Sequence, residues 1–189
     1  NELQTFAGRG RIFFEFVVPR LGKRIDVLAL IDHVVFVIEF KVGESIFSSA
    51  AVDQVWDYAL DLKNFHETSH RCVIAPVLVA TQATRVNTII SSSSHDDGVL
   101  QPIKATPDLL EPTINSVLQL TEGEPIDGFI WESGRYRPTP TIIEAASALY
   151  GHHSVAELSR SDAGEKNLTK TSTAIGQLIN SAKTQRKKA

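Results

Sequence analysis

The amino-acid sequence predicts an α/β fold in which a mixed central sheet is flanked by helices. Three observations support this prediction. Apolar runs of strand length recur within residues 11–81, a short polar pair joins two of them, and a segment with a helical apolar stripe precedes the last. With 42% hydrophobic and 22% charged residues among 189, the composition is ordinary for a globular protein. The length allows one domain with a sizeable core and an appendage.

The first three elements are predicted to be strands. Residues 11–19 form an apolar run interrupted only by Glu15, and the turn at 19–22 ends it. Residues 25–31 and 34–41 are two further apolar runs, which predict paired and buried strands. The segment 42–44 ends the third strand.

A helix is predicted from about Ser48 or Ser49 to about His66, because either serine is a suitable N-cap. Its apolar residues recur at helical spacing: Ala51, Val52, Val55, Trp56, Ala59, Leu62 and Phe65. Residues 73–81 then predict a fourth buried strand. Pro76 has no backbone N–H to donate, so we expect a bulge or an edge position there.

The pattern after the fourth strand predicts short elements. In chain order these are a polar loop at 91–98, a strand at 99–103, one or two helices within 106–120, a strand at 127–131, and helices at 142–150, about 154–158 and 168–183. We therefore expect an α/β core over 1–105, additional strand and loop elements packed on it over 106–140, and a helical connector over 141–189.

Two carboxylates and an ammonium interrupt the apolar second and third strands. Asp26 lies in the second strand, and Glu39 and Lys41 lie in the third. Burying charged groups among apolar residues is costly unless they are paired or used. These three side chains are therefore the first candidates for a functional site.

The hairpin register brings the two carboxylates together. If Asp32-His33 is the two-residue turn, Ile31 faces Val34, and the same register makes Asp26 face Glu39. Because strand side chains alternate between faces, four charged side chains then project from one face: Arg24, Asp26, Glu39 and Lys41. In this register Arg24 faces Lys41.

A divalent cation would explain this arrangement. Directly opposed side chains lie about 5 Å apart, and like charges at that spacing repel. A cation between Asp26 and Glu39 converts the repulsion into coordination, and oxygen ligands with open water positions suit Mg²⁺ or Mn²⁺. Lys41 would orient a water or offset negative charge on a phosphate. The alternative is a buried ion-pair network with no catalysis.

The predicted helix adds a second pair of polar residues. Gln54 and Tyr58 are four residues apart, so they are neighbours at one edge of the apolar stripe. The functional hypothesis is that both face the charged strands. The structural alternative is that Tyr58 packs at the boundary of the core and Gln54 is simply polar there.

The order of these elements resembles the PD-(D/E)XK nuclease superfamily, and Gln54-x-x-x-Tyr58 is similar to its RecB-type branch. The resemblance covers about residues 11–81. It implies an αβββαβ restriction-endonuclease-like core and Mg²⁺-dependent hydrolysis of phosphodiester bonds in nucleic acid, with DNA expected by analogy. Asp26 and Glu39 would bind the metal, Lys41 would position the attacking water, and Gln54 and Tyr58 would orient the substrate or the site.

The chain departs from the superfamily pattern at two places. Ile25 precedes Asp26, where the name-giving motif has proline. A first helix, which often supplies another acid, would lie at or before Asn1. Glu15 is no substitute for that acid, because it lies on a predicted strand. The completeness of the metal site is thereby left open.

A closer resemblance, to bacterial proteins with a Schlafen-group-3-like helicase domain, spans nearly the whole chain. It rests on residues 12–16, 19–26, 38–43, 54–63 and 138–146. In those proteins this region precedes an ATPase, whereas this sequence has no Gly-x-x-x-x-Gly-Lys-Ser/Thr phosphate-binding motif. The resemblance implies that the chain is the N-terminal part of a longer protein, with a C-terminal ATPase as its partner.

Charge and cysteine content give further expectations. The net charge of -3 argues against a general nucleic-acid coat protein, but basic residues gather near both ends of the chain. Among them, Lys23 and Arg24 are expected to contact a nucleic-acid backbone. Cys72 is the single cysteine, which excludes an internal disulfide and fits a cytoplasmic protein. No apolar run has the length of a membrane span, so no membrane partner is expected.

A second motif competes for the functional assignment. The segment His66-Glu67-Thr68-Ser69-His70 matches His-Glu-x-x-His, the motif of zinc metallopeptidases. That chemistry needs both histidines on one helix face, with Glu67 as general base. The match falls where the predicted helix ends, so a polar helix terminus is the alternative. A third hypothesis is a non-catalytic docking or nucleic-acid-binding module of the same fold.

Overall fold

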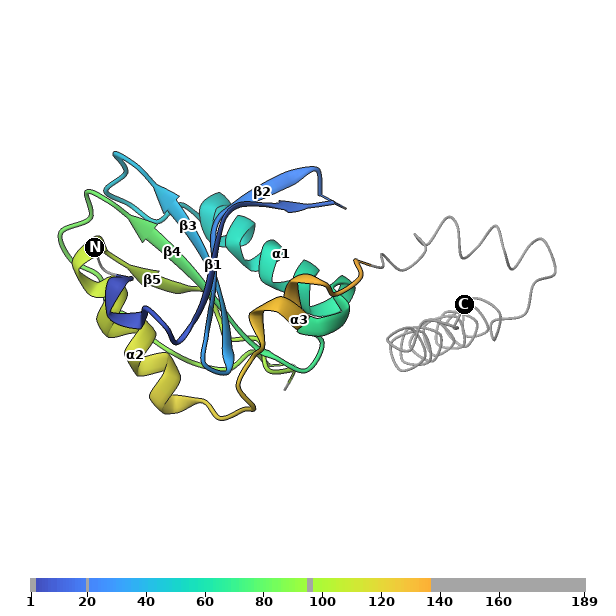
Figure 1. Ribbon diagram of the computed structural model, residues 1–189. Helices are drawn as coiled ribbons and strands as arrows, with labels where there is room; N and C mark the ends of the chain where they lie inside the picture. The colour runs from blue at the N-terminus through green and yellow to red at the C-terminus, as the bar shows by residue number, and fades with distance from the viewer. Residues whose placement is uncertain (1–2, 20, 95–96, 137–189) are drawn as a thin grey trace, which may run out of the picture. The chain divides into compact units, whose positions relative to one another are not determined.

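The computed structural model describes residues 3–19, 21–94 and 97–136, which belong to one compact unit (Figure 1). The helices expected within 141–183 lie outside the described residues. Of the helices that are described, none combines the length and the apolar character needed to cross a membrane.

The fold is α/β, as predicted, and is built on one five-stranded sheet whose spatial order equals the chain order. Its strands are β1 (Gly10–Val18), β2 (Lys23–Ile31), β3 (Val34–Lys41), β4 (Val73–Ala80) and β5 (Ile103–Ala105). β1, β2 and β3 pair antiparallel, whereas β4 runs parallel to β3 and β5 parallel to β4. The predicted mixed sheet is confirmed.

The predicted register of the hairpin is also confirmed. Ile31 pairs with Val34, and Val27 pairs with Ile38. The two residues of the turn are Asp32 and His33, and Asp32 has a positive φ of 51°. Two-residue hairpin turns need such left-handed backbone, which Asp tolerates better than most residues.

Helices cover both faces of the sheet. α1 (Ser49–Phe65) connects β3 to β4, and the hydroxyl of its N-cap Ser48 accepts a hydrogen bond from Ala51 N at 3.3 Å. The predicted cap and length of this helix are confirmed. α2 (Leu110–Leu120) follows the short 3-10 helix η3 (Pro107–Leu109), so the expected helical content of 106–120 is confirmed too.

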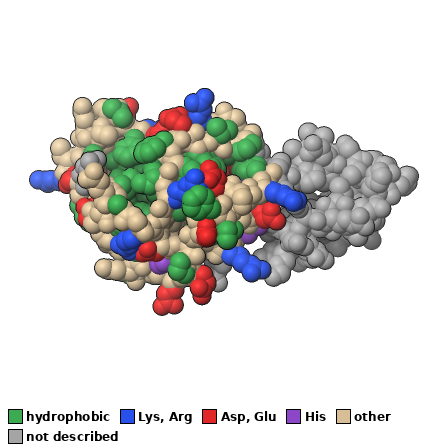
Figure 2. Space-filling model, in the orientation of Figure 1, with side chains coloured by type: hydrophobic (Ala, Val, Ile, Leu, Met, Phe, Trp, Pro, Cys, Tyr) green, Lys and Arg blue, Asp and Glu red, His purple; other side chains and the backbone are tan. Residues whose placement is uncertain are grey.

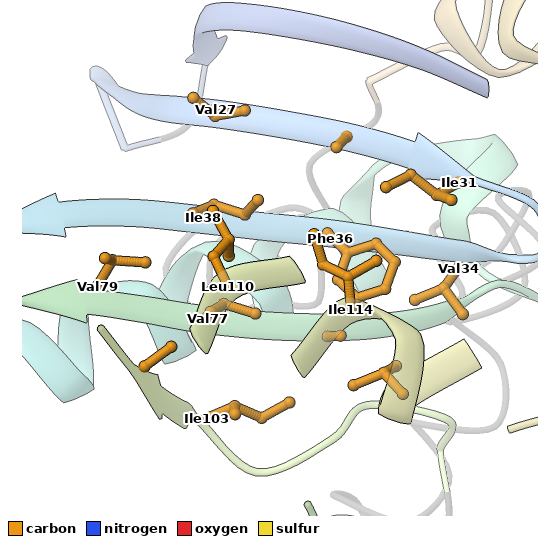
Figure 3. Close-up of a cluster of buried hydrophobic side chains, with 14 of the residues drawn as sticks. Val27, Ile31, Val34, Phe36, Ile38, Val77, Val79, Ile103, Leu110 and Ile114 are labelled. Carbon is orange, nitrogen blue, oxygen red and sulfur yellow. The ribbon is translucent and has the colours of Figure 1, made fainter. Parts of the chain in front are cut away.

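Two apolar cores lie on opposite faces of the sheet. Alternate residues of β3 face α1 (Val35 and Val37) or α2 (Val34, Phe36 and Ile38). Figure 3 shows Leu110 and Ile114 of α2 directed at the second set. Because both faces are covered, β3 and β4 are almost wholly apolar, which is typical of strands in a parallel arrangement. A charged residue in β3 therefore needs a specific partner.

The face of the molecule shown in Figure 2 carries an apolar area over the strands. Around it, Lys and Arg side chains are interspersed with Asp and Glu side chains. This face shows no continuous basic track of the kind that follows a nucleic-acid backbone.

Pro76 lies inside the sheet, so the predicted edge position is wrong. On the β5 side the pairing shifts by one residue between the Ile74–Val99 bridge and the Val77–Ile103 pair, which is the irregularity of a bulge. On the β3 side, Pro76 pairs with Val37 in an unbroken parallel register. Ile74 points its N–H and C=O away from β3, to Gly98 O and Leu100 N, each at 2.9 Å. Pro76 points the same way, since alternate strand residues share a direction. Its missing N–H faces residues 101–102, where no strand is formed.

The strand predicted at 99–103 is displaced. β5 covers Ile103–Ala105, and the preceding residues Val99 and Leu100 form only isolated bridges, to Ile74 and Ser92. The apolar run marked the region correctly, but the neighbouring strand β4 decides which of its residues pair.

The strand predicted at 127–131 is wrong, because these residues form the helix α3 (Gly128–Glu132). The Asp127 carboxylate accepts hydrogen bonds from Phe129 N at 2.8 Å and Ile130 N at 3.1 Å. This cap supplies partners for the free N–H groups of a first helical turn. Of the apolar residues only Trp131 is buried, whereas Phe129 and Ile130 are exposed.

The described residues before β1 contain one short 3-10 helix, η1 (Gln4–Phe6), and no α-helix. The order from β1 to β4, with α1 between β3 and β4, is the predicted one. An acid on a helix ahead of the sheet is therefore not among the residues that the structure describes.

Candidate functional site

The two strand carboxylates meet where the β2–β3 ladder ends. Strand pairing stops at Val27 and Ile38. One residue further, Asp26 N donates to Glu39 Oε1 at 3.2 Å, and Phe40 N donates to Asp26 Oδ2 at 2.8 Å. Each carboxylate thus accepts a bond from the opposite backbone. Asp26 and Glu39 are brought together as predicted, but through their side chains and not as a ladder pair.

A distortion in β1 lies at the same level. Phe14 pairs with Val27 and Phe16 with Ile25, so Glu15 stands opposite Asp26 without joining the ladder. Glu15 has a positive φ of 51°, which is uncommon for a residue other than glycine. Ile25 and Val27 face different cores, so β2 also turns at Asp26. Figure 1 shows the end of the β1–β2 hairpin diverging from β3.

Gln54 of α1 joins the strand residues to the helix. Its Nε2 donates to Glu39 Oε2 at 3.2 Å and to the Tyr58 hydroxyl at 2.9 Å. Its Oε1 accepts from Lys41 Nζ at 3.0 Å. Lys41 Nζ also lies 3.6 Å from Glu39 Oε2. The amide therefore fixes the positions of Glu39, Lys41 and Tyr58 relative to one another.

Burial governs the protonation chemistry of this group. Glu39 is 2% exposed, and desolvation raises the pKa of its carboxyl group, partly opposed by the hydrogen bond from Asp26 N. Tyr58 is also 2% exposed, and burial raises the pKa of its hydroxyl. The fold is therefore less stable when Glu39 is charged, and stability is lost as the pH rises through the raised pKa of Glu39. A bound cation would oppose that effect.

Lys23 and Arg24, at the start of β2, form no hydrogen bond or ion pair with this group of side chains within the described part of the chain. Arg24 pairs with Val17 of β1 and does not face Lys41, so that prediction is wrong. Its NH1 is 3.6 Å from Glu15 Oε2, and 65% of its side chain is exposed. Lys23 is exposed at the start of β2. The predicted pairing of Arg24 with Lys41 failed because the ladder between β2 and β3 already ends at Val27 and Ile38.

Asp26 and Glu39 fit a magnesium-type ion that keeps several waters. Within the described part of the chain, no three His, Cys, Asp or Glu side chains are grouped as metal ligands. Mg²⁺ is commonly held by one or two carboxylates plus water and substrate oxygens. Asp26 uses Oδ2 for the backbone of Phe40, and Oδ1 has no hydrogen bond within the described residues. Asp26 Oδ1 is thus the first oxygen available to a cation.

The His-Glu-x-x-His segment does not lie on one α-helix. α1 ends at Phe65, His66 is extended, and Glu67–Ser69 forms the 3-10 helix η2. His66 Nδ1 lies 2.8 Å from Ser69 Oγ, and His70 Nδ1 lies 2.7 Å from Lys63 O. The single helix that the zinc metallopeptidase motif needs is therefore not formed, and the alternative of a polar helix terminus fits these residues.

His66 instead belongs to an aromatic cluster. Its ring centroid lies 4.3 Å from that of Trp131, and Trp131 Nε1 donates to Ser69 Oγ at 3.0 Å. His66 also forms an isolated bridge with Tyr136. The histidine thus attaches α3 and Tyr136 to the end of α1.

Lys104 of β5 lies on the same face of the sheet as Glu39. It pairs with Leu78 of β4, and Leu78 pairs with Glu39 of β3. No pattern in the sequence marks this lysine as a site residue. A three-residue strand has no pattern of its own, so its register could not be predicted.

A hollow of about 450 Å³ lies elsewhere, between η1 and the first two strands. Leu3, Phe6, Gly10, Ile12 and Leu30 are among the residues that line it. None of the predicted site residues takes part. The carboxylate group is therefore separate from this hollow.

Comparison of the chain with protein-family models, with curated proteins and with solved structures finds no match. The side chains described above are therefore the basis for assigning a function.

Proposed function

We propose that this chain is a metal-dependent nuclease domain that hydrolyses phosphodiester bonds in nucleic acid, with DNA the expected substrate. One observation supports this most strongly. Asp26, Glu39 and Lys41 interrupt the apolar strands at one point, and Gln54 of the facing helix holds two of them. Burying two carboxylates where the backbone ladder between β2 and β3 ends costs folding free energy, and this cost favours a functional role for the two residues.

Asp26 and Glu39 would hold Mg²⁺ or Mn²⁺. Such an ion, when bound, supplies a Lewis acid for the phosphate and lowers the pKa of a coordinated water. Lys41 places a positive charge 3.6 Å from Glu39 Oε2, where it offsets negative charge that develops on a phosphate. Gln54 and Tyr58 keep the Glu39 carboxylate in one orientation, as outer partners of metal ligands generally do.

The first test is cleavage of labelled single-stranded and duplex DNA with Mg²⁺ or Mn²⁺. We expect the wild-type chain to cut and both Glu39→Ala and Lys41→Ala to be inactive. Glu122→Ala and Arg71→Ala are matched controls, because both residues are exposed and lie outside the site. Cleavage that persists in both site variants would refute the assignment.

The second test measures metal binding without activity. Calorimetric titration with Mn²⁺ should show binding to the wild type that Asp26→Ala and Glu39→Ala each remove. The cation should also raise the melting temperature of the wild type more than that of Glu39→Ala, because it compensates the buried charge. Binding that is unchanged in both variants would show that the ion lies elsewhere.

One observation favours a second candidate, a non-catalytic nucleic-acid-binding or docking module. Both oxygens of Glu39 already have partners within the protein, namely Asp26 N, Gln54 and Lys41. A carboxylate satisfied in this way can serve as a structural ion-pair network. DNA binding without cleavage, together with no Mn²⁺ binding, would establish this candidate over the nuclease.

A further inference from the structure

We propose that this chain forms a symmetric dimer through the outer edge of its sheet, with β1 of one copy paired antiparallel to β1 of a second copy. In this dimer, Phe14 of each copy enters the hollow beside Gly10 of the other. None of the residues involved belongs to the carboxylate site, so the dimer is independent of the proposed function.

β1 lies at one edge of the sheet and leaves backbone groups available for pairing. Among the described strands, β2 is its only neighbour. Arg9 O accepts from Asp32 N at 3.0 Å, in the register that continues along β1 and β2. Because successive residues of an antiparallel strand direct their backbone groups to opposite sides, Gly10, Ile12 and Phe14 direct theirs away from β2. No described residue outside the ladder with β2 forms a backbone hydrogen bond to these three residues.

The side chains of this edge are apolar and exposed on the α2 side of the sheet. Ile12 pairs with Ala29 and Phe14 pairs with Val27, and both partners belong to the core beneath α2. Directly paired residues project from the same face. Ile12 is 36% exposed and Phe14 is 72% exposed. Full burial of such a side chain is worth about 1.5–3 kcal/mol, which is available to a partner that covers it.

The edge lacks the features by which exposed strands usually avoid pairing. Natural edge strands are protected by lysine, proline, inward-pointing charge or a bulge. Between Gly10 and Phe14 there is no lysine or proline, and the one charged residue, Arg11, is held by Glu132 of α3 at 2.7 Å. The backbone distortion at Glu15 comes only after this segment. Residues 10–14 are therefore open to a second strand.

The hollow of about 450 Å³ lies beside the same segment. Gly10 and Ile12 line it from β1, whereas Leu3 and Phe6 line it from η1 and the residue ahead of η1. A Cβ added at Gly10 would lie 1.7 Å from Leu30 O, so no side chain of this position can fill the hollow. An apolar cavity of about 150 Å³ can already hold benzene. The hollow thus has room for an aromatic side chain from outside the chain.

One register of two β1 strands brings these features together. With a two-fold axis between the Ile12 residues of the two copies, Phe14 of each copy lies opposite Gly10 of the other, and the outward-directed backbone groups bond to each other. The same register places Arg9 opposite Glu15, and their side chains are 44% and 63% exposed. These charges add to the partners that each residue has within its own copy. Hollow, aromatic side chain and opposite charges each occur twice, as a self-complementary interface requires. A second copy of this chain is therefore the partner that fits the edge.

The first test measures the molar mass by sedimentation equilibrium over a series of protein concentrations. We expect the wild type to form a dimer that dissociates on dilution. Phe14→Ala should weaken the dimer by at least about 100-fold, because two aromatic side chains are lost per dimer. Ile89→Ala is the matched control and should behave like the wild type, because Ile89 is 62% exposed and lies between β4 and β5, the strand at the other edge. A wild type that is monomeric at every concentration, or a Phe14→Ala dimer as stable as the wild type, would overturn the inference.

The second test examines the register in a Cys72→Ser background, which removes the single cysteine. Ile12→Cys should be joined to its copy by a short bismaleimide, because the Cα atoms of a hydrogen-bonded antiparallel pair lie about 5.5 Å apart. Val17→Cys is the control: Val17 is 56% exposed on the same strand, but this register separates it from its copy by roughly 34 Å. Absence of the Ile12→Cys product, or equal cross-linking of both variants, would overturn the register and with it the proposed dimer.

Discussion

His66 provides a quantitative test of how burial controls stability in this fold. The ring is 3% exposed and stacks on Trp131. Burial, followed by the nearby charge of His70, lowers the pKa of His66 from 6.5 to about 4. At about 1.4 kcal/mol for each pH unit, this difference corresponds to about 3 kcal/mol of stability.

The direction of the effect follows from proton binding. Between the two pKa values the unfolded chain binds a proton at His66 that the folded chain does not. The contribution is therefore fully present above pH 6.5 and is lost as the pH falls through about 4. We expect the free energy of unfolding to decrease on acidification by about 3 kcal/mol from this residue alone.

His66→Phe is the matched variant, because phenylalanine keeps the aromatic contact and cannot titrate. Ser69 Oγ keeps the hydrogen bond from Trp131 Nε1 at 3.0 Å in this variant. Urea unfolding followed by tryptophan fluorescence at a series of pH values gives the difference between the two proteins, in which other titrating groups cancel. Equal pH dependence of wild type and variant, or an NMR titration of His66 near 6.5, would refute the reasoning.

Two further predictions concern the fold. Asp127→Ala should destabilise the chain by about 1 kcal/mol in urea unfolding, because it removes the acceptor for Phe129 N and Ile130 N, whereas the exposed Glu124→Ala should have little effect. Gly10→Ala should destabilise it by about 1–3 kcal/mol, because the new Cβ would lie 1.7 Å from Leu30 O. Gly8→Ala is the control for backbone strain, because Gly8 has a φ of +82° but no atom within 4 Å of an added Cβ. If Gly10→Ala were as stable as the wild type, the close approach of Gly10 to Leu30 O would be contradicted.

Strong periodic signals predicted the regular elements of the fold well. The apolar runs of β2 and β3, the turn at Asp32-His33 and the Ser48 cap of α1 all lie where the sequence places them. Each of these depends on residues close together in the chain. The strand predicted at 127–131 failed because its apolar residues suit either a strand or a helix, and the Asp127 cap decides between them.

For the candidate site, the sequence by itself determined which residue types interrupt the apolar strands and that Asp26 and Glu39 lie close together. It also placed Gln54 and Tyr58 as neighbours on one helix face. Only the tertiary structure decided that the ladder opens at Asp26, that Gln54 joins Glu39 to Lys41, and that Arg24 turns away to Glu15. The physical reason is that alternation and helical spacing are local properties of the chain. The divergence of two strands and the alignment of Lys104 with Glu39 instead depend on contacts between distant segments.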